Sequence, residues 1–67
     1  MAHNEFMAKV ITNKLDNILC AIDSIENDLR YMNEDTNEEM KDALTELFRA
    51  YVAIADCSSE IYTVYQL

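Results

Sequence analysis

The chain of 67 residues contains neither glycine nor proline and carries a formal net charge of -8. Without glycine, it cannot build the loops that cradle nucleotide phosphates or the sharp turns that present a catalytic serine. The negative charge disfavours direct binding to nucleic acids and to anionic membranes, which requires clustered lysine and arginine. What remains is a helix-forming chain with one domain, residues 1–67, whose core is marginal at this length.

The first predicted element is a helix over residues 5–32. Its apolar residues alternate steps of three and four, which is the spacing of a helix that packs lengthwise against another helix. These seam residues are Ala8, Ile11, Leu15, Ile18, Ile22, Ile25, Leu29 and Met32. An alternative for the start of the chain is that translation begins at Met7, which would make residues 1–6 a vector remnant.

A polar interval follows the first helix and carries signals for a helix end and a helix start. Asn33 suits the left-handed position after a helix end. The next helix is capped either by Thr36 with Glu39 or by Asp35 with Glu38, since both pairs have the spacing of a capping box. A connection this short forces the two helices to run antiparallel.

The second predicted helix covers residues 37–65, which leaves a turn at 33–36. The three-and-four spacing resumes there at Met40, Leu44, Leu47, Tyr51, Ile54, Ser58, Ile61 and Tyr65. If the chain folds back, seam residues at equal distances from the turn meet, as Ile18 does with Ile54. These pairs keep one register along the whole seam, so the spacing predicts an antiparallel helical hairpin.

The second helix has more apolar surface than one neighbouring helix can cover. Residues beside the two seams are therefore expected to mediate self-association, namely Leu19, Phe48, Val52, Ala55 and Tyr62. Symmetric dimers are the commonest way to cover such a surface. The predicted fold is thus all-α, an antiparallel helical hairpin that pairs into a homodimeric four-helix bundle. Such a dimer resembles the plasmid RNA-regulating protein Rop, in topology alone.

Few residues could carry catalysis or hold a metal ion. His3 is the single histidine, and Cys20 and Cys57 lie far apart in the sequence, so a zinc site lacks ligands. A partial calcium-loop pattern begins at Asp35, but Met40 stands where that loop needs glycine. We therefore expect no enzyme activity, no cofactor and no metal, and we expect the cysteines to be small core residues in a reducing compartment.

The distribution of apolar residues also bears on the cellular location. No stretch approaches the roughly 18 consecutive apolar residues of a membrane-spanning helix. Residues 1–9 contain no apolar run of the kind found in a secretory signal. These features predict a cytoplasmic protein without a membrane partner.

Acidic residues gather on both sides of the predicted turn. Between positions 23 and 46, nine acidic residues stand against two basic ones. They have two interpretations. They favour the helix start electrostatically and keep the chain soluble, or they imitate a phosphate backbone and bind a basic protein surface. The residues of such a partner-binding acidic face are Glu34, Asp35, Glu38, Glu39, Asp42 and Glu46.

Three functions agree with these features. The first is a small acidic, non-enzymatic regulator or inhibitor, phage- or plasmid-encoded, that occupies the basic, nucleic-acid-binding surface of a partner protein. The second is an adaptor or co-chaperone that shields a hydrophobic helical partner. The third is direct RNA binding by a Rop-like dimer, which ranks lowest because the charge has the wrong sign.

Overall fold

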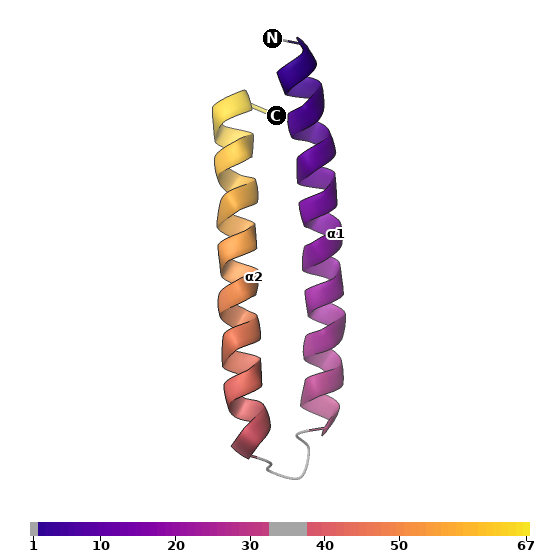
Figure 1. Ribbon diagram of the computed structural model, residues 1–67, viewed down its shortest axis with the longest axis vertical. Helices are drawn as coiled ribbons and strands as arrows, with labels where there is room; N and C mark the ends of the chain where they lie inside the picture. The colour runs from indigo at the N-terminus through magenta and orange to yellow at the C-terminus, as the bar shows by residue number, and fades with distance from the viewer. Residues whose placement is uncertain (1, 33–37) are drawn as a thin grey trace.

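The computed structural model describes residues 2–32 and 38–67, which form two helices, α1 (Ala2–Met32) and α2 (Glu38–Tyr65). The helices lie side by side and antiparallel, with the start of α1 and the end of α2 at the same end of the molecule (Figure 1). We call this end the open end. The hairpin is 52 Å long and 15 by 11 Å across. The prediction of an all-α helical hairpin is confirmed.

Both helices are long and uninterrupted because the sequence holds no residue that would break them. α1 spans 31 residues and α2 spans 28, and neither contains the glycine or proline that commonly kinks a helix. α1 begins before the predicted residue 5. The predicted turn and its capping residues, Asn33 to Thr36, lie outside the described residues.

The end of α2 has a specific backbone cap. Gln66 adopts a left-handed conformation with φ of 51°, and the N–H of Leu67 donates a hydrogen bond of 3.2 Å to the carbonyl of Tyr62. This is the pattern of a Schellman motif, in which a left-handed residue lets the chain satisfy a carbonyl in the last helical turn. Glutamine occupies the position where glycine is usual, so the helix ends here without the residue that normally signals its end.

The core is very small. Side chains are described for residues 3–32 and 40–67, and among them the buried ones are Ala8, Thr12, Ile22 and Ser58. The accessible surface is 5239 Å², whereas a compact monomer of 7.8 kDa exposes about 4,400 Å². A single hairpin therefore leaves roughly 800 Å² more surface in contact with water than a compact protein of this size.

α1 does not bury its predicted seam evenly. Between Ala8 and Met32, its residues spaced by seven form three columns on the side of the predicted seam. The Ala8 column (Ala8, Leu15, Ile22, Leu29) and the Thr12 column (Thr12, Leu19, Glu26) are buried or half-buried, whereas the Ile11 column (Ile11, Ile18, Ile25, Met32) is exposed.

The seam prediction is therefore wrong for half of α1. Thr12, which the spacing placed beside the seam, is the most deeply buried side chain at 2% exposure, and its hydroxyl donates a hydrogen bond to the carbonyl of Lys9. A helix with one neighbour buries one contiguous arc of its surface. Because Ala8 and Thr12 are small, that arc lets the two helices approach closely, and the bulkier isoleucines are left at its edge.

α2 follows its predicted seam more closely. Ser58 is buried, and the other seam residues from Met40 to Ile61 are half-buried. The hairpin thus uses the seam of α2 from Met40 to Ile61, with Tyr65 exposed, but only one seam column of α1.

The two cysteines correct another expectation. Both Cys20 and Cys57 are free thiols, and both are exposed, so the expectation that they are core residues is wrong. Each lies outside the seam spacing, on a part of its helix that does not face the other helix.

Candidate interaction surfaces

The Ile11 column forms an exposed apolar strip along α1. Ile11, Ile18 and Ile25 are 42%, 44% and 47% exposed, and Met32 is 63% exposed. At 1.5 Å per residue the strip is about 30 Å long. Isolated exposed apolar residues are ordinary, but a row of them along one side of a helix is a candidate contact surface.

At the open end, the strip leads into a shallow apolar hollow between the two helices. Its volume is about 230 Å³, and it is lined by Asn4, Met7, Ala8, Ile11, Ile61 and Tyr65. The hollow brings together both residue pairs that the hairpin register predicts at this end, Ala8 with Tyr65 and Ile11 with Ile61. It exists because Ala8, the smallest seam residue of α1, leaves room in front of the larger side chains.

The residues predicted to mediate self-association differ in how exposed they are in the hairpin. Phe48, Val52 and Tyr62 on α2 are exposed and available for contact. Leu19 and Ala55 are half-buried, and Leu19 belongs to the covered Thr12 column. The spacing gave no sign that the Ile11 column would be free, because its residues have the same periodicity as the buried ones.

The structure describes two side chains of the predicted acidic face, Asp42 and Glu46. Both are exposed on α2. Glu38 and Glu39 belong to the first turn of α2, although their side chains lie outside the described set. The remaining predicted residues, Glu34 and Asp35, fall in the part of the chain that the structure does not describe.

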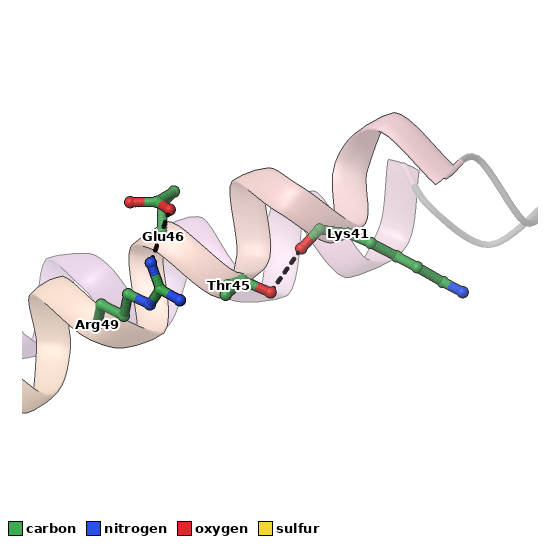
Figure 2. A network of polar contacts seen from close by, with 4 residues as sticks. All are labelled: Lys41, Thr45, Glu46 and Arg49. Carbon is green, nitrogen blue, oxygen red and sulfur yellow. Dashed lines mark hydrogen bonds and ion pairs between the residues drawn. The ribbon is translucent and has the colours of Figure 1, made fainter.

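Contacts around Glu46 stay within α2. Figure 2 shows the Glu46 carboxylate 3.3 Å from the Nη1 atom of Arg49 and the Thr45 hydroxyl donating to the Lys41 carbonyl at 3.0 Å. An exposed ion pair between neighbours on one helix contributes only a few tenths of a kcal/mol. Glu46 can therefore exchange this contact for one with a partner at little cost.

α1 adds further carboxylates to the same half of the hairpin. Asp23 and Asp28 are exposed, and Glu26 lies 3.3 Å from the Nε atom of Arg30. Because Asp23 and Asp28 on α1 and Asp42 and Glu46 on α2 face water, their fields add over a broad surface at the turn half of the molecule. Such a surface attracts a basic partner over a distance of about one Debye length, near 8 Å at physiological salt.

Within residues 2–32 and 38–67, no three histidine, cysteine or acidic side chains come together as a metal site. Neither described helix contains an apolar stretch long enough to cross a membrane.

In comparisons with known proteins, no family model, no curated protein and no solved structure matches this chain. The function therefore has to be inferred from the two surfaces that the hairpin presents, the acidic turn half and the apolar strip.

Proposed function

We propose that this chain is a small, non-enzymatic protein-binding regulator or inhibitor that occupies a basic surface of a partner protein. The observation that carries the proposal is the exposure of carboxylates on both helices at the turn half, including Asp23 and Asp28 on α1 and Asp42 and Glu46 on α2. A rod that presents fixed rows of carboxylates offers a nucleic-acid-binding protein a substitute for a phosphate backbone.

We also propose that the working form is a homodimeric four-helix bundle. The small core and the roughly 800 Å² of excess surface support this proposal, since a chain of this size needs further burial to be stable. Dimerisation would double the net charge of the assembly and strengthen its attraction to a basic partner.

The cytoplasm is the proposed compartment. Cys20 and Cys57 are exposed and free, and exposed free thiols persist in a reducing compartment but are oxidised outside it.

The acidic face is tested by reversing its charge in the triple variant Glu38→Lys, Asp42→Lys and Glu46→Lys. We expect the variant to capture at least about tenfold less partner protein from the source cells than the wild type does. We also expect the amount captured by the wild type to fall as salt rises from about 0.05 to 0.3 M, because salt screens the same electrostatic attraction. The captured proteins are quantified by mass spectrometry, and circular dichroism verifies that the variant is folded.

A matched control reverses three exposed acids of the open half, Asp16→Lys, Asp56→Lys and Glu60→Lys. This control has the same net charge as the turn-half variant and should retain its partner. If both triple variants lose the partner equally, net charge rather than the acidic face is responsible, and the proposal fails.

An adaptor or co-chaperone is the second candidate, and the exposure of Phe48, Val52 and Tyr62 favours it. In that case the apolar surface would be reserved for a helical client, and the isolated chain would gain helicity only when the client is added. A purified chain that melts sharply as a homodimer would exclude this alternative.

A further inference from the structure

We infer that the Ile11 column of α1 binds the same column of a second copy. The two α1 helices lie antiparallel across a two-fold axis at Ile18, with the turns of the two hairpins at opposite ends of the bundle. This inference rests on the proposed dimer and adds its contact face, its direction and its register.

The amount of uncovered surface fits a second copy. A stable protein–protein interface of standard size buries about 800 Å² on each partner, which matches the roughly 800 Å² by which the hairpin exceeds a compact protein of its mass. The half-exposed isoleucines of α1 supply the apolar centre that such an interface requires.

The column is symmetric about Ile18. Ile11 and Ile25 lie equally far on either side of it, and Asn4 and Met32 lie equally far beyond them. A two-fold interface is self-complementary, so a residue before the axis meets a residue after it. With the axis at Ile18, that residue meets its own counterpart, and Ile11 meets Ile25 of the second copy.

The hollow at the open end has a matching protrusion in this register. Asn4 and Ile11 line the hollow, and they lie opposite Met32 and Ile25 of the second copy. Those two side chains are 63% and 47% exposed in the single hairpin. When these two side chains enter the hollow, they fill the space in front of Ala8. The apolar atoms of the hollow and of the inserted side chains are then both covered, as in knobs-into-holes packing.

Charge favours the antiparallel direction. The segment from 23 to 46 contains nine acidic and two basic residues, so two hairpins with their turns together would concentrate like charge at one end. With the turns at opposite ends, the acidic half of one copy lies beside the open half of the other, where Lys9 and Lys14 of α1 balance Glu5 and Asp16. The mutual repulsion is then smaller because the distance between the like charges is larger.

The side of α1 that turns away from α2 carries little charge near the proposed axis. The residues that continue the surface from the Ile11 column away from the Thr12 column are Met7, Val10, Lys14, Asn17, Ala21, Ser24, Asp28 and Tyr31. Lys14 and Asp28 are the charged residues in this set, and Ala21 is small enough to admit a neighbouring helix. Depletion of charge is typical of the centre of an interface.

Spin labels on one exposed column of α1 test the arrangement without altering the contact face. Each variant carries a single labelled cysteine. The first keeps native Cys20 and carries Cys57→Ser. The other two carry Cys20→Ser and Cys57→Ser together with either Asn13→Cys or Asn27→Cys. All three sites are exposed and seven residues apart, so their sideways displacement in the dimer is similar. Pulsed electron paramagnetic resonance measures the distance between the labels of the two copies.

For two antiparallel α1 helices with the axis at Ile18, the offset between equivalent labels along the bundle is about 6 Å at Cys20, 15 Å at Asn13 and 27 Å at Asn27. We therefore expect the measured distances to increase in that order. Equal distances at all three sites would mean parallel hairpins and would overturn the proposed direction. A shortest distance at Asn13 or Asn27 would overturn the proposed register.

Sedimentation equilibrium on the same labelled samples separates this inference from the proposal on which it rests. A monomer without an intermolecular distance would overturn the dimer itself. A dimer whose distances follow another order would leave the dimer standing and overturn only the contact through the Ile11 column.

Discussion

The two helices of the hairpin share one hydrophobic spacing and use it differently. α2 turns both of its seam columns toward α1, and its seam residues from Met40 to Ile61 are buried or half-buried. α1 turns the Ala8 and Thr12 columns toward α2 and leaves the Ile11 column in water, with Ile18 at 44% exposure. The asymmetry shows that two helices are too few to cover the apolar surface that the sequence provides.

This difference has a consequence for the function of each helix. The exposed column of α1 is regular and symmetric, which suits contact with another copy of itself. The exposed apolar residues of α2, such as Phe48 and Val52, lie beside its seam, and α2 also carries the exposed carboxylates of Asp42 and Glu46. α1 therefore provides the centre of the proposed bundle, and α2 provides the surface that is left for a partner.

A charge placed at the proposed axis should have the largest effect on the dimer. Ile18→Asp puts two carboxylates face to face in an apolar contact, so we expect the dimer to weaken by roughly 1,000-fold or more. Asn13→Asp adds the same charge at an exposed site of α1 and should change the affinity by no more than about threefold. Sedimentation equilibrium gives both dissociation constants, and an Ile18→Asp protein that remains dimeric would contradict the proposed contact.

The hairpin was predictable because its signal is repeated along the whole chain. Each three-and-four step from Ala8 to Met32 indicates a helix, and the absence of glycine and proline leaves the single polar interval as the place to turn. The choice of buried columns was not predictable. Periodicity shows which apolar residues share one side of a helix, but the sizes of Ala8 and Thr12 determine which part of that side approaches α2. Thr12 is not apolar and is absent from the predicted seam.

A second comparison uses the two kinds of column in α1. Ile22 is 8% exposed within the hairpin, so Ile22→Ala should lower the free energy of unfolding by about 3 kcal/mol at any protein concentration. Ile25 is 47% exposed, so Ile25→Ala should cost about 1 kcal/mol where the chain is monomeric and about 3 kcal/mol where it is dimeric.

Urea unfolding of both variants at low and high protein concentration checks this expectation. The informative result is the change in the Ile25→Ala penalty with concentration, because Ile22→Ala serves as the internal control. A penalty for Ile25→Ala that stays near 1 kcal/mol in a demonstrated dimer would place the contact on another face of the hairpin.

The candidate site was only partly accessible from the sequence. The clustering of acids around the turn is a property of composition and could be counted directly, and Asp42 and Glu46 are exposed as an acidic face requires. The sequence predicts excess apolar surface mainly on α2, because the additional apolar residues lie beside the seam of that helix. The exposed strip on α1 depends on the rotation of that helix about its axis, which results from packing and leaves no separate sequence signal.

The smallest predicted effect is that of a substitution at Thr12, which tests why this side of α1 faces α2. Thr12, Thr45 and Thr63 each donate a hydroxyl hydrogen bond of 3.0 Å to a carbonyl in the preceding turn, but only Thr12 of these three is buried. Replacing it by valine keeps the shape and substitutes a methyl group for a hydroxyl at the contact with α2, while the carbonyl of Lys9 can keep its helical hydrogen bond. We expect Thr12→Val to stabilise the hairpin by about 0.5–1 kcal/mol, and Thr45→Val and Thr63→Val to leave the free energy of unfolding within about 0.5 kcal/mol of the wild type. Thermal unfolding of the three variants side by side measures the difference. If Thr12→Val behaves like the two exposed controls, Thr12 is in water, and α1 must instead turn the Ile11 column toward α2.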